Sequence, residues 1–337
     1  MKTYLRILGC LSLLTFVAWR LDWSRFGAAF ARLDLTLWFG ALVLFVGAQV
    51  VSSVRWKLLA GALGFSGSTL RYVGYYFIGM FFNLALPSSV GGDVARAWYL
   101  ADQEGGATKP RRLEAFLSVF SERLSGILML AALACVAALC CPVPLPGWVI
   151  VSVALVGAGA LGGTILLMLI PAREAGGEGI LARLSSVSAA YRSKPRLLML
   201  TFVLSIVVQA ASVALVAIIG AALDLSVPPL YWAVIVPLVS LLTLLPISIN
   251  GMGLREMGFI LLLKPLGIET AAAVGLSLLT FAATSLPALG GAGVMLFGRF
   301  PRLAAQKGGV SVEVRSDDEP VRGDSDQGRA RQSSAAA

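Results

Sequence analysis

The sequence has no histidine among its 337 residues, and this absence excludes several classes of enzyme. A Ser-His-Asp triad, a Cys-His nucleophile and a histidine-ligated metal site all need an imidazole ring. Cysteine is scarce too, and the four cysteines lie in or beside apolar runs: Cys10, Cys135, Cys140 and Cys141. We interpret them as small packing residues and expect no disulfide framework, no metal and no cofactor.

Charged residues are also few, at 13% of the chain, whereas a soluble domain carries about 25%. Hydrophobic residues make up 58% and the mean hydropathy is +0.84. Several apolar runs reach the roughly 20 residues that cross a bilayer. The sequence therefore predicts an all-α polytopic membrane protein. The net charge of +9 fits membrane flanks that face anionic lipid, and we expect no nucleic-acid partner.

The apolar runs predict six full spans, at about 4–20, 36–54, 112–139, 148–171, 198–220 and 270–298. Residues 21–35 alternate at helical spacing and predict an amphipathic helix in the interface. Residues 55–57, Arg-Trp-Lys, are interpreted as an interfacial anchor that closes the second span. The stretch 172–197 predicts a polar loop, and 301–337 a disordered cytoplasmic tail.

The distribution of lysine and arginine predicts the orientation in the membrane. The loops 141–147 and 221–229 contain neither residue and are expected to face outward. The segments 88–112 and 172–197 are rich in both and are expected to face the cytoplasm, as are both termini.

This orientation makes two apolar stretches, 70–100 and 230–263, begin and end on the same side. Each is therefore predicted to be a re-entrant hairpin, bent at a proline in a polar break (86–96 and 245–256). When Pro87 is aligned with Pro246, a serine, a glycine and an arginine also coincide: Ser89 with Ser248, Gly92 with Gly251, and Arg96 with Arg255.

The same alignment, extended along the whole chain, also places spans of one half on spans of the other. The transmembrane domain, 1–300, is therefore predicted to contain two structural repeats, about 1–140 and 147–299. Three crossings per repeat make the second one inverted. Transporters built in this way bind substrate at the broken helices near the midplane.

The first break is typical of a helix start, with serine as the N-cap and Asp93 in the first turn. Free N–H groups there attract anions such as phosphate, and Arg96 adds a bidentate donor. The substrate-binding candidates are Ser88, Ser89, Gly91, Gly92, Asp93, Arg96, Glu122, Arg123, Ser248, Asn250, Gly251, Arg255 and Glu256. The alternative is that both breaks are structural kinks whose arginines pair with Asp93 and Glu256.

Glu122 and Arg123 lie within a span, where a charge costs about 2.5–3.5 kcal/mol and should face protein or water. Adjacent helical residues do not face each other, so we expect Glu122 to pair with Arg96, and Arg123 with Asp93. Two interpretations stay open: a structural ion pair, or the charged wall of a cavity or proton-linked site. Three further polar residues are expected to form interhelical hydrogen bonds: Gln49, Asn83 and Gln209.

Together these residues resemble the lysylphosphatidylglycerol synthase transmembrane family, also called flippase-like membrane proteins. The resemblance covers about residues 5–300 and is carried by Arg55-Trp56, the two breaks, and Glu122-Arg123-Leu-Ser-Gly126. It implies a bacterial inner-membrane protein whose partners are membrane lipids, either an anionic phospholipid or a polyprenyl phosphate. The synthase has a large soluble aminoacyl-transfer domain after its membrane region, whereas here Arg299 is followed by a short polar stretch. We therefore expect no lysyl transfer and no enzymatic activity.

The first functional hypothesis is a flippase-like lipid transporter that binds the head group at the two breaks. The sequence contains no Walker A motif to couple it to ATP. Two alternatives remain. One is an intramembrane lipid-modifying transferase with Asp93 or Glu122 as its base. The other is a non-transporting membrane partner of a separate lipid-synthesis enzyme.

Overall fold

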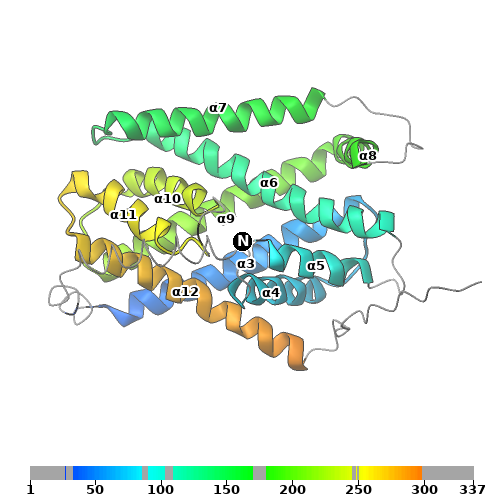
Figure 1. The fold of residues 1–337 in the computed structure, drawn as a ribbon, viewed down its shortest axis with the longest axis horizontal. Helices are drawn as coiled ribbons and strands as arrows, with labels where there is room; N and C mark the ends of the chain where they lie inside the picture. Colours follow the sequence, from blue (N-terminus) through cyan, green and yellow to red (C-terminus); the bar gives the residue numbers. More distant parts are fainter. Residues whose placement is uncertain are drawn as a thin grey trace, which may run out of the picture. The chain divides into compact units, whose positions relative to one another are not determined.

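The computed structural model describes residue 27 and residues 33–85, 90–102, 109–169, 180–244, 248 and 250–297, which all belong to one unit, Met1–Pro301. Every regular element within these ranges is helical, as the all-α prediction requires (Figure 1). The predicted first span (4–20), most of the predicted interfacial helix (21–35) and the tail (301–337) lie outside the described residues.

The helices agree closely with the apolar runs. They are α3 (Leu35–Ala62), α4 (Thr69–Ala85), α5 (Gly91–Asp102), α6 (Lys109–Cys140), α7 (Gly147–Leu169), α8 (Ile180–Arg192), α9 (Pro195–Ala222), α10 (Pro229–Thr243), α11 (Leu254–Leu263) and α12 (Thr270–Phe297). Within the described ranges, α3, α6, α9 and α12 are long and apolar enough to cross a membrane.

The predicted anchor at the end of the second span is wrong. α3 continues past that predicted end to Ala62, and it buries Arg55 and Trp56, which are 3% and 0% exposed. Trp56 Nε1 donates to Ser118 Oγ on α6 at 3.1 Å. Arginine beside tryptophan is equally compatible with a lipid interface and with a helix contact, so only the packing distinguishes them.

The segment 172–197, predicted to be a loop, contains α8, which packs against α6 and α9. Its inward side includes Ser185 and Val187, which are 1% and 4% exposed. The sequence did not predict this helix, because its composition is mostly polar and its buried face is short.

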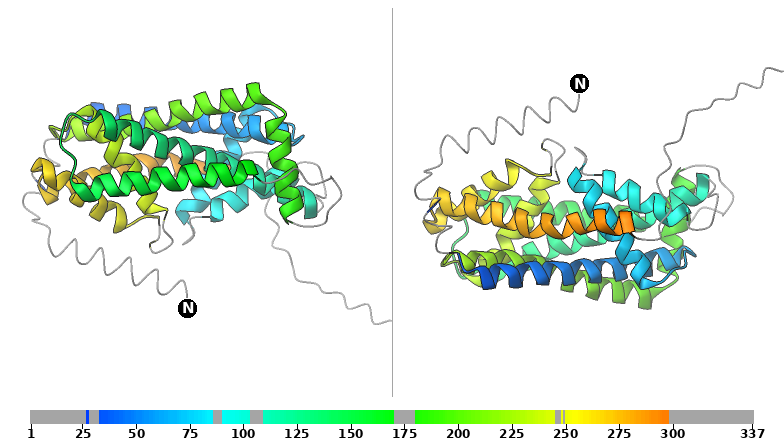
Figure 2. Two further views of the ribbon diagram at one scale, coloured as in Figure 1. Left: turned by 90° about the horizontal axis from the view of Figure 1, so that it is seen from above. Right: turned by 90° about the horizontal axis from the view of Figure 1, so that it is seen from below.

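α3 and α9 pack along their length and run antiparallel (Figure 2). Asp34, which caps α3 through its Oδ1, donates its backbone N–H to the Ala222 carbonyl at the end of α9, at 3.1 Å. At the other end, Lys194 Nζ donates to the Ala62 carbonyl at 3.4 Å.

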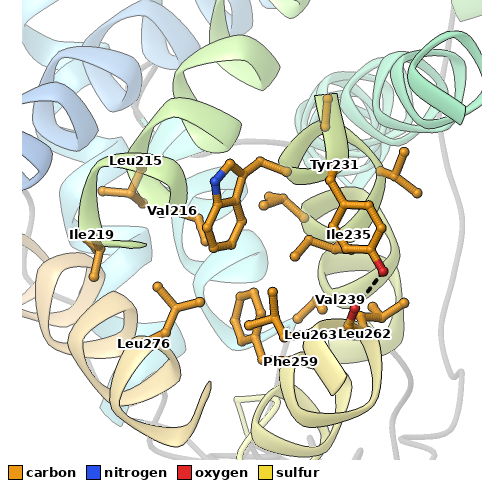
Figure 3. Packing of buried hydrophobic residues seen from close by; sticks show 14 of the residues in the cluster. Leu215, Val216, Ile219, Tyr231, Ile235, Val239, Phe259, Leu262, Leu263 and Leu276 are labelled. Carbon is orange, nitrogen blue, oxygen red and sulfur yellow. Dashed lines mark hydrogen bonds between the residues drawn. The ribbon is translucent and has the colours of Figure 1, made fainter. Parts of the chain in front are cut away.

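Two pairs of shorter helices, α4–α5 and α10–α11, lie toward opposite ends of the α3–α9 pair (Figures 1 and 2). In the first pair the backbones touch, because a Cβ on Gly92 would overlap the Gly79 carbonyl oxygen. In the second pair, Tyr231 Oη donates to the Leu262 carbonyl at 2.7 Å (Figure 3).

Each short pair has its own apolar core. Trp56, Tyr72, Tyr75 and Ile78 are among the buried residues around α4 and α5. A larger cluster surrounds α10 and α11 and reaches α9 and α12, where Leu215, Val216, Ile219 and Leu276 face it (Figure 3).

The outer side of α9 is apolar and exposed, as shown by Met199, Phe202, Val203, Ile206 and Val207, which are 45–68% exposed. An exposed apolar surface of this extent is typical of a membrane-facing helix.

We predict that Gly291→Ala destabilises the protein, because a Cβ there would overlap the Phe77 carbonyl oxygen of α4. Forcing the helices apart should cost about 1–3 kcal/mol. The matched control is Gly290→Ala in the same helix, where a Cβ meets nothing within 4 Å. The control should be neutral or slightly stabilising, because alanine favours a helix. Thermal unfolding in detergent is the measurement, and equal midpoints for the two variants would refute the prediction.

Candidate functional site

Five charged side chains from α3, α5 and α6 meet between the helices, and we call them the charge cluster: Arg55, Asp93, Arg96, Glu122 and Arg123. Apart from Arg123, each of these residues is at most 5% exposed. Because an unpaired buried charge is costly, the pairing within the cluster decides whether this arrangement is stable.

The cluster alternates in sign along a continuous chain of contacts. One Glu122 oxygen pairs with Arg55, and the other accepts from Arg96 Nη2 at 2.9 Å. Arg96 also lies 3.0 Å from Asp93 Oδ1, and Asp93 Oδ2 pairs with Arg123. Both predicted pairs, Glu122 with Arg96 and Arg123 with Asp93, are confirmed. The residue that sequence reasoning missed is Arg55, which also donates to Ser205 Oγ on α9 at 2.8 Å.

The pairing is incomplete, because three arginines face two carboxylates and leave one net positive charge. Arg55 Nε and Arg96 Nη1 are buried and have no hydrogen-bond partner within the described part of the chain. The Arg96 guanidinium is held between ring faces, 5.2 Å from the Trp56 centroid and 4.8 Å from that of Tyr76. These ring contacts hold the Arg96 side chain in place.

The charge cluster lines a cavity of about 560 Å³, within the range of about 300–1,000 Å³ usual for ligand sites. The other polar lining residues come from five helices: Gln49, Ser52, Tyr76, Asn83, Gln209, Ser212, Ser240, Thr243 and Thr284. The predicted interhelical hydrogen bonds form for Gln209, whose Nε2 donates to the Gly126 carbonyl at 3.0 Å, and for Asn83. Gln49 lines the cavity.

The first break differs from the predicted anion-binding helix start. The Gly92 N–H donates to Asn83 Oδ1 at 2.8 Å, and the Asp93 N–H donates to the Val90 carbonyl at 3.1 Å. These two donors are therefore used within the protein, and Gly92 serves mainly the close contact with Gly79. α5 begins at half-buried Gly91, whereas Ser88 and Ser89 lie outside the described residues.

The second break turns through left-handed backbone, with φ of 52° at Asn250, 72° at Gly251 and 81° at Gly253. A side chain on Gly251 would also press on Thr243, whose Cγ2 would lie 2.6 Å from its Cβ. Glu256 is 2% exposed and caps α11 by accepting from the Gly253 N–H.

Arg255 donates through Nε to Ser277 Oγ at 2.9 Å and through Nη2 to Glu256 at 3.3 Å, so its predicted pairing with Glu256 is present. Its guanidinium also lies 4.8 Å from the Phe281 centroid. The Ser248 hydroxyl is buried and has no hydrogen-bond partner in the described ranges.

The two breaks come together in space. Arg255 and Asn250 line a smaller pocket of about 200 Å³, and this pocket shares Met80, Asn83 and Thr284 with the larger cavity. The two aligned arginines, Arg96 and Arg255, are far apart in the sequence and yet border adjoining polar spaces.

Apolar helices of membrane-spanning length that enclose buried ion pairs define a multi-pass helical membrane protein. The family model described as "Lysylphosphatidylglycerol synthase TM region" matches residues 4–291. The chain belongs to this family, and the family points to a role connected with membrane lipids. Neither the curated proteins nor the solved structures include a significant match.

We predict that Glu122→Gln destabilises the protein strongly, because it leaves Arg55 and Arg96 as buried cations without their shared carboxylate. Breaking a buried pair in this way typically costs about 3–5 kcal/mol. The control is Glu114→Gln on the same helix, which breaks a partly exposed pair with Arg111 and should cost about 1 kcal/mol or less. Thermal unfolding in detergent measures both. Adding Arg55→Gln to Glu122→Gln should recover part of the loss, and no recovery would contradict the pairing argument.

Proposed function

We propose that the protein is a flippase-like transporter that moves a lipid with a phosphate head group across the bacterial inner membrane. The observation that carries this proposal is the charge cluster, which has one more arginine than carboxylates and lines a cavity inside a helical membrane unit. The partners are membrane lipids, either an anionic phospholipid or a polyprenyl phosphate.

The charge balance favours an anionic ligand. An uncompensated cation within a bilayer is costly, so a bound anion would relieve the net positive charge of the cluster. A phosphate matches the geometry as well, since guanidinium donors bind its oxygens through strong, charge-assisted hydrogen bonds. Because Arg96 is held by Trp56 and Tyr76, little side-chain entropy remains to be lost when the ligand binds.

The helix boundaries support two inverted repeats. α3 and α9 have the same length, 28 residues, and they hold equivalent places in the two halves (Leu35–Ala62 and Pro195–Ala222). Both helices end at a leucine cap, Leu63 and Leu223, followed by a left-handed residue. The contacts between the two helices repeat as well, because Asp34 with Ala222 and Lys194 with Ala62 are the same pair of positions exchanged between the halves. A two-fold axis perpendicular to two antiparallel helices exchanges one helix for the other and therefore repeats such contacts at both ends.

The short helices support the two re-entrant hairpins. α4, α5, α10 and α11 have 17, 12, 15 and 10 residues, whereas a full crossing needs about 20. The α4–α5 and α10–α11 pairs also lie at opposite ends of the long helices (Figure 2). In this plan α3, α6, α7, α9 and α12 cross fully and both termini are cytoplasmic; the predicted sixth span, 4–20, lies outside the described residues.

The two halves differ in the charges that surround their aligned arginines. Glu122, which pairs with Arg96, aligns with Phe281, which stacks on Arg255, when the two prolines are aligned. The same place on the bundle therefore holds a carboxylate in one half and an aromatic ring in the other. The network of charges surrounds only the first of these two arginines.

A lipid-modifying transferase is less well supported. Its base would have to be Asp93 or Glu122, and each carboxylate is already paired with two arginines, so neither is free to take a proton from a substrate. We therefore propose transport without enzymatic chemistry.

We predict that Arg96→Lys and Arg255→Lys both slow lipid flipping, because an ammonium cannot reproduce the planar contacts of a guanidinium. The loss of a hydrogen bond between charged groups, about 1.5–3 kcal/mol, corresponds to roughly tenfold to a hundredfold. Scrambling of phosphatidylglycerol, polyprenyl phosphate and phosphatidylcholine in proteoliposomes at matched protein level is the measurement. The control is Arg71→Lys, which changes an exposed arginine outside the cavity.

Normal flipping by both lysine variants would show that the head group does not depend on contacts with the two arginines. A wild-type protein that flips no lipid of the panel would refute transport. That result would favour the alternative in which the protein is a non-transporting partner of a lipid-synthesis enzyme.

The topology gives a separate prediction. In a background without the four native cysteines, Pro144→Cys between α6 and α7 should react with an impermeant maleimide from outside the cell. Ser186→Cys on α8 should react only from the cytoplasmic side. Both positions are exposed, so accessibility does not limit labelling. Labelling of both cysteines from the same side would contradict the orientation.

A further inference from the structure

We propose that an apolar groove between α6, α9 and α10 holds a hydrocarbon chain of the lipid whose head group occupies the charged cavity. This proposal rests on the proposed function and adds to it the place of the lipid tail. The groove has a volume of about 490 Å³, and the residues that define it are Leu133, Val213, Ala214, Ala217, Trp232 and Ala233.

The groove lies beside the cavity, and both are lined by α6, α9 and α10. On α6 the cavity is lined by Gly126, Ile127 and Leu130, and the next residue on that face, Leu133, lines the groove. On α9 the two linings interleave, with Gln209 and Ser212 facing the cavity and Ala210 and Val213 facing the groove. The two spaces share no lining residue and adjoin along α6 and α9, and the groove extends toward the loop between α9 and α10.

The chemistry of the lining differs between the cavity and the groove. Gln209 and Ser212 line the cavity on α9, whereas Val213, Ala214 and Ala217 line the groove. A charged, polar space beside an apolar one matches the two parts of a phospholipid, its phosphate head group and its hydrocarbon chain. The position of the groove beside the cavity is the reason for assigning a lipid chain to it.

The groove is built from small residues against a fixed wall. On α9 its floor is formed by alanines at helical spacing: Ala210, Ala214, Ala217 and Ala221. The opposite wall includes Trp232, which is 3% exposed and packs so closely on Gly220 that a Cβ there would overlap its ring. Trp232 is thus fixed against α9 at Gly220, beside the row of alanines.

The corresponding positions in the first half are filled. When α3 and α9 are aligned from their first residues, Lys57 is the counterpart of Ala217, and its Nζ donates to Thr69 Oγ1 at 2.9 Å. In the same alignment Phe65 is the counterpart of Leu225. Phe65 is 5% exposed and is covered by the Arg111 guanidinium at 3.7 Å. At these two positions the first half therefore has Lys57 and Phe65, each held by a contact, where the second half has residues that line the groove. With the proposed orientation the groove lies in the outer half of the membrane.

The groove is expected to position the lipid and to contribute little to its binding affinity. Bilayer chains are as apolar as the alanine and leucine side chains, so a chain gains little free energy by leaving the bilayer for the groove. The groove instead lets the head group reach the arginines while the chain stays among apolar side chains. Filling the groove should therefore block transport of long-chain lipids sterically.

The test fills the groove with Ala214→Phe and compares it with Ala154→Phe, the same change at an exposed position of α7. Flipping of dipalmitoyl phosphatidylglycerol should fall by about tenfold or more in the groove variant, equivalent to about 1.4 kcal/mol, and should be unchanged in the control. Binding of dibutanoyl phosphatidylglycerol, whose chains are too short to need the groove, should be retained by both variants. Retained binding also shows that the variant is folded. Equal flipping by both variants would overturn the proposal.

A second measurement needs no substitution. Phosphatidylglycerol with a diazirine at the chain end, in phosphatidylcholine vesicles, should crosslink to Leu133, Val213 or Ala217, and excess phosphatidylglycerol should compete. Adducts confined to the exposed faces of α7 and α9 would overturn the groove even if Ala214→Phe fails to fold. If the protein flips no lipid but still forms adducts in the groove that excess phosphatidylglycerol suppresses, the groove is a lipid-binding site and the proposed transport is refuted. Running polyprenyl phosphate in parallel identifies which kind of chain is accepted.

Discussion

The fold depends on the neutralisation of charges that lie among membrane-spanning helices. Glu122 is 2% exposed and has arginines on both sides, Arg55 from α3 and Arg96 from α5. This single carboxylate therefore joins three helices, and removing it would leave two buried cations at once. Because the bilayer offers no water to solvate them, the helices must stay assembled for the charges to be tolerable.

The same contacts hold the short helix of the first break in position. α5 has 12 residues, and its Asp93 and Arg96 both pair with α6. Its other side lies against α4 at a distance that glycine alone permits, at Gly79 and Gly92. Ionic contacts on one side and backbone contact on the other thus fix a helix too short to cross the membrane, and they fix the direction of the Arg96 donors.

A difference between the two halves of the bundle links this architecture to the proposed path for lipid. The first half concentrates the charges, with Glu122 at the place that Phe281 has in the second. The second half has the alanine-lined groove, at the place that Lys57 and Phe65 fill in the first. In the proposed two-repeat plan, the first half therefore has the polar site and the second half the apolar one.

Much of the fold was determined by the sequence alone, because membrane-spanning length and apolar composition are local properties of a chain. The spans at 36–54, 112–139, 198–220 and 270–298 correspond to α3, α6, α9 and α12. The pairing of Glu122 with Arg96 was also predictable, since a charge within a span needs a partner on another helix. The tertiary structure decided that Arg55 joins them, because its neighbours are equally compatible with a lipid interface. It also decided that the Gly92 N–H is used by Asn83 and that Ala214 and Ala217 line a groove, because both depend on distances between helices that no local pattern encodes.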